Sequence, residues 1–528
     1  MKVLISDKLS EEGLNILKQC SEIQFEVHAG LAPEELRKII GNYEALIIRS
    51  GTTVDEALIA AADNLKIIGR AGIGVDNVDL NAASKKGIIV ENTPSGNAVT
   101  TAEHAIAMLF SVSRMIPQAS MSMKQGKWEK KKFMGRELCN KNLGIVGVGN
   151  IGKIVADRAL GLKMKVLGYD PFLSSEAASK LGIELVDLDT LFKKADYITV
   201  HVPLNDKTKN LINQAAFEKM KSGVFIVNCA RGGIVNEKDL LAALESGKVG
   251  GAALDVFEQE PPAEDDALVN HPQVVCTPHL GASTDEAQVN VAIEVAEQVV
   301  DYLTKGEIRN AVNFPSISAE LAKILKPFFE LCEKVGSLQG HFLESSPKVI
   351  KIEYSGDLTN YPLAPLTTCV LKGILETVLS DVGVNFVNSP VLAKERGIKV
   401  IESKVSESEN FTSLVKVSVE TDKGVQSISG TMFGINNPRI VKVNDFFLEF
   451  VPQGHTLLIR NLNTPGVIGN IGSLLGENKI NISRMQLGLS HGSEEALSFY
   501  NVDSQVGDEV LKKIKALPNI ISVKEFKL

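Results

Sequence analysis

The stretch Leu143-Gly144-Ile145-Val146-Gly147-Val148-Gly149-Asn150-Ile151-Gly152 places the pattern G-x-G-x-x-G directly after a short apolar run. Gly147 permits a tight turn, Gly149 lets the backbone approach a pyrophosphate, and Gly152 lets the following helix pack closely on the strand. Phosphate oxygens would then lie on the free N–H groups at the start of the helix that we predict over 153–160. This stretch predicts a dinucleotide-binding unit.

An acidic residue in the expected place supports this interpretation. Asp170 follows the next apolar run and lies 18 residues beyond Gly152. Its carboxylate can accept hydrogen bonds from the hydroxyls of an adenosine ribose. Pro171 comes next, and no arginine follows that could neutralise a 2′-phosphate. The expected cofactor is therefore NAD rather than NADP.

Short apolar runs alternate with helical stretches on both sides of this loop. Compact runs of this kind are typical of buried parallel strands, and their alternation with helices indicates an α/β fold. A first group of strands is expected at 3–6, 23–27, 45–48 and 65–68. A second group, of six strands, is expected at 143–146, 166–169, 198–200, 224–228, 251–255 and 274–276. Long helices are predicted over 100–115 and 286–305.

The C-terminal part has a different pattern. Residues 310–318, with Pro315, are typical of a linker, and 317–452 has mixed helix and strand signals without a chemical motif. From His455 to Phe526 the expected order is strand, helix, strand, strand, helix, strand, with a turn at 490–493. That order is typical of a ferredoxin-like domain.

Composition limits the functional classes. With 528 residues the chain is long enough for several domains, and its formal charge of −8 gives no reason to expect nucleic acid as a partner. The six cysteines are scattered without a C-x-x-C pair, so we expect no metal site and a reducing compartment. No run is long and apolar enough for a membrane span or a signal peptide, so we expect a cytoplasmic protein.

Three residue types with complementary chemistry follow later strands. They are Arg231, flanked by glycines, Glu260, beside two prolines, and His279. A histidine can accept the hydroxyl proton that leaves during hydride transfer, a carboxylate can orient that histidine, and an arginine can bind a substrate carboxylate. Each residue alone is also compatible with a structural role. Their common position at the carboxyl ends of strands favours a catalytic group.

At this point the sequence resembles the D-isomer-specific 2-hydroxyacid dehydrogenases, and within them the long-form branch that acts on 3-phosphoglycerate. The resemblance covers essentially the whole chain. It rests on six segments, at 69–79, 92–97, 147–152, 228–233, 251–262 and 278–283.

The resemblance implies a role for individual residues. The family's catalytic arginine, glutamate and histidine fall on Arg231, Glu260 and His279. The implied NAD contacts are Gly147, Gly149, Asn150, Ile151, Gly152, Asp170, Cys229, Ala230, Asp255, His279, Gly281 and Ala282. The implied substrate contacts are Arg49, Arg70, Gly72 and Asn97. The run Lys130–Lys132 is either a solvated basic loop or a contribution to a neighbouring subunit.

The resemblance also implies four domains. Residues 1–96 and 287–313 would form a flavodoxin-like substrate-binding domain, into which a Rossmann NAD-binding domain, 97–286, is inserted. An α+β intervening regulatory domain, 317–452, and a ferredoxin-like ACT domain, 453–528, would follow. Closure of the first two domains on each other would exclude water during hydride transfer.

The implied activity is NAD-dependent oxidation of 3-phospho-D-glycerate in L-serine biosynthesis, with 2-oxoglutarate as an additional oxo-acid substrate, by a homotetramer. Asn463 and Asn481 fall where ACT domains bind amino acids, which suggests L-serine as an effector, although both could equally be turn residues. Two alternatives stay open. One is another D-2-hydroxyacid dehydrogenase, such as a glyoxylate, hydroxypyruvate or D-lactate reductase, and the other is an NADH-sensing co-regulator.

Overall fold

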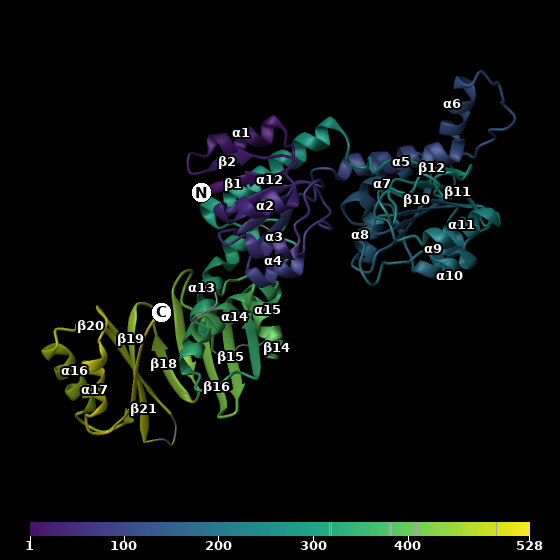
Figure 1. Cartoon of the computed structure of the whole chain (residues 1–528). Coiled ribbons are helices and arrows are strands. Elements are labelled where there is room, and N and C mark those ends of the chain that lie inside the picture. The colour runs from purple at the N-terminus through teal and green to yellow at the C-terminus, as the bar shows by residue number, and fades with distance from the viewer. Residues whose placement is uncertain (316, 318, 380–382, 406–409, 491, 493) are drawn as a thin grey trace.

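Three bodies, each built around one β-sheet, make up the computed structural model (Figure 1). The structure describes residues 1–528 except 316, 318, 380–382, 406–409, 491 and 493. The body that contains the N-terminus lies between the other two, so the molecule is elongated (Figure 1). In the described part of the chain, no helix is both long and apolar enough to cross a membrane.

The first sheet is parallel and has the strand order β2-β1-β3-β4-β5. This is the order of flavodoxin-like folds, and it confirms the expectation from the sequence. Its strands are β1 (Lys2–Ile5), β2 (Gln24–Val27), β3 (Ala45–Ile48), β4 (Ile67–Arg70) and β5 (Ile89–Asn92). Its helices are α1 (Glu11–Gln19), α2 (Pro33–Ile39), η1 (Ile40–Asn42), α3 (Glu56–Ala61), α4 (Leu80–Lys86) and α12 (Asp285–Lys305).

Alternating side chains of this sheet pack on opposite layers. Leu4 and Leu46 belong to the core with α2, α3 and α4, whereas Val3 and Ile47 belong to the core with α1 and α12. Both faces of the sheet are therefore covered. Polar side chains are left for the carboxyl ends of the strands, where ligands of open α/β sheets bind.

The second sheet is also parallel, with the order β12-β11-β10-β9-β6-β7-β8. Its first strand along the chain, β6, lies inside the sheet between β9 and β7, as in dinucleotide-binding folds. The strands are β6 (Asn142–Val146), β7 (Lys165–Tyr169), β8 (Glu184–Leu185), β9 (Tyr197–Val200), β10 (Val224–Asn228), β11 (Val249–Leu254) and β12 (Val274–Cys276). The helices are α5 (Ala98–Arg114), α6 (Ile116–Lys124), α7 (Asn150–Gly161), α8 (Ser175–Lys180), α9 (Leu188–Lys194), α10 (Gln214–Lys219) and α11 (Glu237–Glu245).

The chain crosses between these two bodies twice, and the two connecting segments are joined by hydrogen bonds and close packing. Thr100 Oγ1 lies 3.3 Å from Thr284 Oγ1, and Ser95 Oγ donates to Glu294 at 2.9 Å. Gly96 packs so closely on Val291 that a Cβ would lie 2.7 Å from that side chain. The two connections therefore run side by side.

The third body contains one sheet of ten strands, in the order β14-β13-β15-β16-β17-β18-β20-β21-β19-β22. Its strands are β13 (Val349–Gly356), β14 (Lys399–Val405), β15 (Ser413–Thr421), β16 (Gly424–Met432), β17 (Pro438–Val443), β18 (Phe446–Phe450), β19 (His455–Leu462), β20 (Ile482–Leu489), β21 (Glu495–Val502) and β22 (Ile520–Lys527). Its helices are α13 (Ala319–Phe342), η2 (Asp357–Asn360), α14 (Ala364–Val378), α15 (Ser389–Glu395), α16 (Val467–Glu477) and α17 (Asp508–Lys515).

From β19 to β22 the chain has the expected ferredoxin-like order of elements, β19-α16-β20-β21-α17-β22. Its four strands lie in the order β20-β21-β19-β22 within the sheet. This part joins the preceding strands through a single register pair, Phe447 with Leu489. Leu457 and Tyr500 pack under α16 and α17, whereas Leu458 and Phe499 belong to the core that contains α13 and α14. We expected separate domains at 317–452 and 453–528, and the shared sheet is a feature that the sequence did not predict.

Some predicted elements differ from the structure. The second sheet has seven strands rather than six, because the two-residue strand β8 pairs with β7. The strand expected at 65–68 begins at Ile67, and the strand expected at 251–255 is β11, which ends at Leu254. We did not predict β5. Of the expected linker and turn, Ser316, Ser318, His491 and Ser493 lie outside the described residues.

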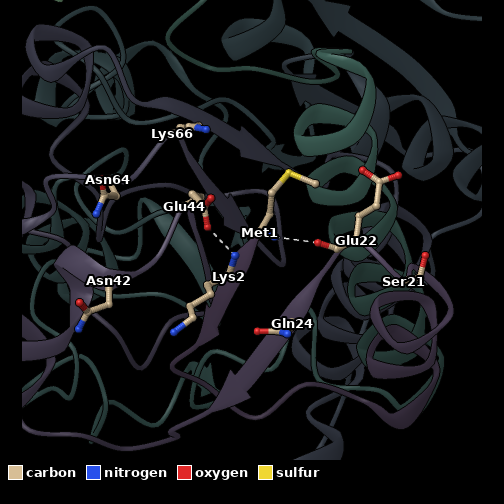
Figure 2. Close-up of a pocket in the computed structure, with 9 residues that line it drawn as sticks. All are labelled: Met1, Lys2, Ser21, Glu22, Gln24, Asn42, Glu44, Asn64 and Lys66. Atoms are coloured by element: carbon tan, nitrogen blue, oxygen red, sulfur yellow. Dashed lines mark hydrogen bonds between the residues drawn. The ribbon is translucent and has the colours of Figure 1, made fainter.

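A polar cavity of about 530 Å³ opens at the amino ends of the first sheet's strands (Figure 2). Lys2, Glu22, Glu44 and Lys66 line it, and the Lys2 amide donates to Glu44 at 2.5 Å. The residues implied as substrate contacts follow the opposite, carboxyl ends of these strands. This cavity is therefore separate from the candidate site described next.

Candidate active site

The implied substrate and catalytic residues come from the carboxyl ends of both parallel sheets. Arg49 directly follows β3, Arg70 ends β4, and Asn97 lies between β5 and α5. On the second sheet, Arg231 follows β10, Glu260 follows β11 and His279 follows β12. Because β10, β11 and β12 are neighbours, the three residues gather at one edge, as the sequence predicted.

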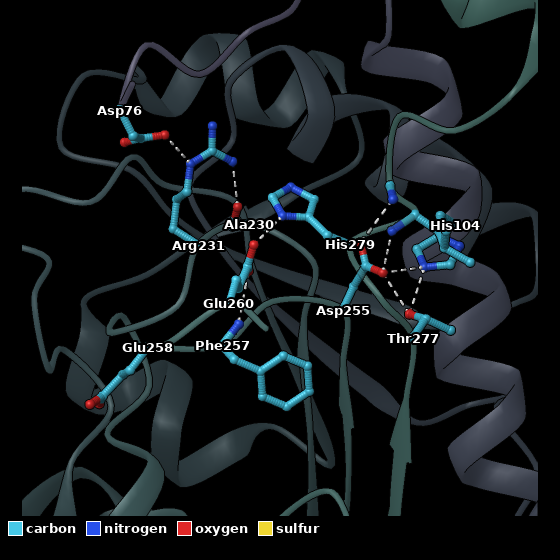
Figure 3. Close-up of polar contacts among 12 residues, drawn as sticks. Asp76, His104, Ala230, Arg231, Asp255, Phe257, Glu258, Glu260, Thr277 and His279 are labelled. Atoms are coloured by element: carbon cyan, nitrogen blue, oxygen red, sulfur yellow. Dashed lines mark hydrogen bonds and ion pairs between the residues drawn. The ribbon is translucent and has the colours of Figure 1, made fainter. Parts of the chain in front are cut away.

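His279 and Glu260 form a hydrogen-bonded pair. Nδ1 of His279 donates to Oε2 of Glu260 at 2.7 Å, and Oε1 of Glu260 accepts the Phe257 amide at 3.1 Å (Figure 3). The second bond fixes the carboxylate from behind. With Nδ1 engaged, Nε2 is the nitrogen left for a substrate hydroxyl, and the carboxylate stabilises the imidazolium form.

The loop that carries His279 is held by Asp255, whose side chain is 0% exposed. Asp255 Oδ1 accepts the Thr277 hydroxyl at 2.6 Å and the Leu280 amide at 2.7 Å, and Oδ2 accepts the Gly281 amide at 2.8 Å. His104 Nε2 of α5 lies 3.2 Å from Oδ1. Burial alone would raise the pKa of Asp255, but these hydrogen bonds, first that of His104, lower it below its ordinary value.

These hydrogen bonds fix the position and the backbone conformation of His279. Its φ is +54°, in the left-handed region that non-glycine residues rarely adopt. The His279 amide also donates to the Asp255 carbonyl at 3.0 Å. Asp255 was implied as an NAD contact, and its carboxylate is fully engaged in positioning the histidine loop.

Arg231 reaches from the second sheet to the first. Its Nε donates to Asp76 Oδ2 at 2.8 Å, and its Nη1 donates to the Ala230 carbonyl at 2.6 Å (Figure 3). The guanidinium lies against Gly74, where any Cβ would overlap Nη2. Arg231 is therefore placed between the two bodies, beside the His279–Glu260 pair (Figure 3).

The arginines of the first sheet lie near Arg231. Burial lowers the pKa of Arg70 to about 10, and the positive charges of Arg231 and Arg49 contribute to this shift. Arg70 packs against Gly72, where a Cβ would overlap its guanidinium, and its buried Nε has no hydrogen-bond partner among the described residues. Crowded cations with an unused donor are the features of a site for a multiply charged anion.

In the described part of the chain, Asn97 has an unpaired side-chain atom, whereas the backbone amide of Gly72 is already hydrogen-bonded. Asn97 is 7% exposed, and its buried Oδ1 has no partner within the described structure. The Gly72 amide already donates to Thr93 Oγ1 at 2.6 Å. An anion held by the backbone here would therefore use the amides of Ile73 or Gly74.

The glycine loop has the geometry that the sequence predicted. Gly147 has a φ of +93°, and a Cβ at Gly152 would overlap the Gly147 carbonyl. A Cβ at Gly149 would meet nothing within 4 Å, so open space lies where a pyrophosphate would approach. Asp170 Oδ2 accepts the Val148 amide at 2.9 Å, which holds the loop next to the acid expected to bind ribose.

The other implied NAD contacts lie around this loop and the histidine loop. Asn150, Ile151 and Gly152 open α7, and Gly281 and Ala282 follow His279. Cys229 and Ala230 directly follow β10. Burial raises the pKa of the Cys229 thiol, so this residue is a neutral packing group rather than a nucleophile.

The two candidate effector residues are not brought together within one chain. Asn463 follows Leu462, which pairs with Glu495, whereas Asn481 precedes Ile482, which pairs with Val502. Those positions on β21 are seven residues, or about 23 Å, apart. A site that uses both asparagines needs a second copy of the chain.

Several functional residues were missed by sequence reasoning. Asp76 and Asp7 lie among the arginines: Asp7 Oδ2 accepts the Arg49 amide at 2.6 Å, and the negative charges of both acids offset part of the lowering of the Arg70 pKa. His104 and Thr277 support Asp255. For the acids a signal was present, because Asp7 follows β1 as Arg49 follows β3. His104 comes from a distant helix, α5, so no local pattern reveals its contact with Asp255.

Three family profiles match successive parts of the chain. Residues 106–281 match the D-isomer specific 2-hydroxyacid dehydrogenase NAD binding domain. Residues 324–444 match the D-3-phosphoglycerate dehydrogenase intervening domain, and residues 455–519 match the ACT domain.

Whole-chain relatives are also found. The chain is 45% identical to the D-3-phosphoglycerate dehydrogenase of Archaeoglobus fulgidus and 41% identical to that of Bacillus subtilis, each over 99% of both chains. Among solved structures, it resembles a glyoxylate reductase from Paecilomyes thermophila (30% identity, TM-score 0.55, 59% of this chain and 98% of that one). It also resembles the D-lactate dehydrogenase of Aquifex aeolicus in complex with NAD and lactic acid (29% identity, TM-score 0.52, 60% of this chain and 100% of that one).

Proposed function

Because the chain belongs to the D-3-phosphoglycerate dehydrogenases of the D-isomer-specific 2-hydroxyacid dehydrogenase family, we propose that it oxidises 3-phospho-D-glycerate to 3-phosphohydroxypyruvate with NAD. This is the first step of the phosphorylated route to L-serine. The observation that carries the proposal is the His279–Glu260 hydrogen bond of 2.7 Å, on the sheet edge that also carries Arg231.

The residues divide the reaction between them. His279 Nε2 removes the proton of the C2 hydroxyl, and Glu260 holds the ring and stabilises its cationic form. Arg231 binds the substrate carboxylate and polarises the C2 oxygen. Arg49 and Arg70, with the side-chain N–H groups of Asn97 as further donors, bind the phosphorylated end, since a phosphate dianion adds to the charge of the carboxylate.

The cofactor site fits NAD. Gly149 leaves room for the pyrophosphate, the first turn of α7 supplies free amides, and Asp170 is placed for the ribose. When bound, NAD supplies the nicotinamide C4 that accepts the hydride. Asp255 acts through the loop, because its hydrogen bonds to the Leu280 and Gly281 amides keep His279 at that position.

The domain roles follow from this arrangement. We assign substrate binding to 1–96 and 287–313, NAD binding to 97–286, and regulation to the intervening domain, 317–452, and the ACT domain, 453–528. The first boundary is supported by Asn97 at the start of α5. All six cysteines carry free thiols, as in a reducing compartment, which supports a cytoplasmic location.

We propose a homotetramer held by two self-associating surfaces. The first is the arm of residues 116–136, which projects from the second body with α6 (Figure 1). It exposes Ile116, Met121, Met123, Trp128 and Met134, and the Trp128 side chain is 80% exposed. An apolar set of this kind on a projecting arm favours a second copy as its cover, and that copy would bring Lys130–Lys132 near its neighbour.

The second surface is the ACT domain, because Asn463 and Asn481 can share one ligand only across two chains. Two different two-fold interfaces on one chain generate a four-chain assembly. Replacing Met121 and Met123 by Glu should yield dimers in light scattering, and replacing Lys124 by Glu should leave tetramers. Tetramers in both variants would remove the arm from the interface.

Regulation by L-serine is tested with the same ACT pair. Inhibition by serine should be lost in Asn463→Ala and in Asn481→Ala, and an equimolar mixture of the two variants should regain it, because mixed pairs form one intact site. Asn470→Ala, on the exposed face of α16, is the matched control. Wild-type activity that ignores serine would assign this domain to another ligand or to assembly alone.

The activity itself is tested by NADH formation from NAD and 3-phosphoglycerate, in both directions, beside a panel of substrates. The panel includes D-lactate, glyoxylate, hydroxypyruvate and 2-oxoglutarate. A higher kcat/KM for 3-phosphoglycerate than for the unphosphorylated acids is expected. Preference for an unphosphorylated acid would make the chain another D-2-hydroxyacid dehydrogenase. NADH binding without turnover of any acid would favour the co-regulator.

A further inference from the structure

Asp76 forms an ion pair with Arg231, the residue that we propose binds the substrate carboxylate. The carboxylate lies on the Gly-rich loop after β4, and it pairs with Nε of Arg231 across the two bodies at 2.8 Å (Figure 3). Neither the sequence motifs nor the proposed roles assign it a function. The chemical group that Asp76 presents, a carboxylate, is the same group that the substrate presents to this arginine.

The hydrogen bonds of the Arg231 guanidinium limit how a substrate carboxylate can bind to it. A carboxylate can bind an arginine with two parallel bonds either through Nε and one Nη nitrogen or through both Nη nitrogens. Asp76 takes Nε, and the Ala230 carbonyl takes Nη1. Among the described residues, Nη2 donates to none. Each two-bond edge of Arg231 therefore has one position already filled.

Of the two occupants, Asp76 is the one that can leave. The Ala230 carbonyl belongs to the backbone next to Arg231 itself, whereas the Asp76 side chain is 64% exposed. The loop does not depend on it either, because the neighbouring Asn77 anchors the loop through the carbonyls of Arg49 and Thr52, at 2.7 and 2.6 Å. Releasing Asp76 exposes Nε and Nη2 together.

We propose that Asp76 is an internal competitor of the substrate, which holds Arg231 in the free enzyme and is displaced when the substrate carboxylate binds. This inference rests on the proposed role of Arg231. In the free enzyme, Asp76 holds the Arg231 guanidinium beside Gly74. Without Asp76, this guanidinium would lie near Arg70 and Arg49 with no counter-ion of its own among the described residues. Displacement lowers the apparent affinity for any carboxylate that uses Arg231.

The test compares Asp76→Asn with wild type. The amide keeps the size and an acceptor but loses the charge, so KM for 3-phosphoglycerate should fall about 3-fold or more while kcat changes less. Direct binding of malonate, a dicarboxylate that is not turned over, should tighten by a similar factor in calorimetry of the NADH-bound enzyme. Asp63→Asn, an exposed acid remote from these arginines, controls for the loss of one negative charge.

A second background separates displacement from a general field effect. In Arg231→Gln, malonate should bind more weakly, and adding Asp76→Asn should no longer improve it. The same gain in both backgrounds, or a KM that stays or rises in Asp76→Asn, would overturn the inference. If Arg231→Gln leaves malonate binding unchanged, the role of Arg231 itself is wrong, which is a failure of the proposed function rather than of Asp76 alone.

Discussion

Nδ1 of His279 lies 2.7 Å from Oε2 of Glu260, although the two residues follow different strands and His279 has a left-handed backbone. The backbone conformation is one that few residues tolerate, and it is kept because the Asp255 carboxylate binds the amides that follow. The pair is therefore imposed by the surrounding loop rather than by the two side chains alone.

Replacing His279 by Gln should lower kcat about 100-fold or more, because the C2 hydroxyl proton then has no acceptor. Gln keeps a polar side chain of similar reach, so NAD affinity should change little. Steady-state kinetics and NADH titration measure the two quantities. Turnover equal to that of wild type would show that another group removes the proton.

Glu260→Gln should lower kcat about 10-fold or more, since an amide does not stabilise the imidazolium. KM for 3-phosphoglycerate should change less than kcat, because Glu260 binds His279 through Nδ1. Steady-state kinetics measure the two quantities.

Glu260→Asp keeps the negative charge and is the matched control, which should retain more of kcat than Glu260→Gln. A kcat in Glu260→Gln equal to that of wild type would mean that the carboxylate does not stabilise the cationic form of His279.

Asp255→Asn should impair the loop that carries His279. An amide can accept at one atom only, so either the Leu280 or the Gly281 amide would lose its partner inside a buried site. We expect kcat to fall more than KM rises, and the free energy of unfolding to fall by about 1–3 kcal/mol. Asp189→Asn, on the surface of the same body, is the control. Unchanged stability and kcat would contradict the positioning role.

Glu91 gives a prediction for stability against pH. Burial raises the pKa of this carboxyl to about 8, and the Arg309 amide and charge offset only part of the shift. Between the ordinary pKa of 4.5 and about 8, the folded chain holds a proton that the unfolded chain releases. The contribution of Glu91 is therefore fully present at low pH and is lost as the pH rises through about 8.

Glu91→Gln removes this ionisation. Relative to wild type, the variant should gain on the order of 4 kcal/mol of unfolding free energy between pH 5 and pH 9, measured by urea unfolding. Comparing the difference between the two proteins removes the slope from His201, whose pKa burial lowers to about 4. A difference that is constant with pH would mean that Glu91 is ionised in the folded chain throughout.

Much of the first two bodies could be predicted from local sequence. Strands such as β3, β10 and β12 are short, continuous and apolar because both faces of their sheets are covered, and their bounds matched the prediction. The strand β5 was missed because its buried residues include Glu91 and Asn92, which do not read as a strand interior. The pairing of β18 with β20 could not be predicted, since it depends on one contact between segments distant in sequence.

The candidate site shows the same division. Arg231, Glu260 and His279 follow strands at places where their residue types are unusual, so position and chemistry both pointed to them. Asp76 and His104 act through partners on other elements, at distances that only the folded chain defines. Gly72 was expected as a substrate contact, and its amide donates to Thr93, a partner that the sequence did not indicate.

The two joined connections between the first two bodies restrict how one body can turn relative to the other. A single connection would let the two bodies twist about it, whereas two adjacent connections joined through Thr100 and Thr284, with Gly96 packed on Val291, resist that twist. The orientation of the first sheet's arginines relative to His279 is therefore restricted by the connections as well as by contacts within the site.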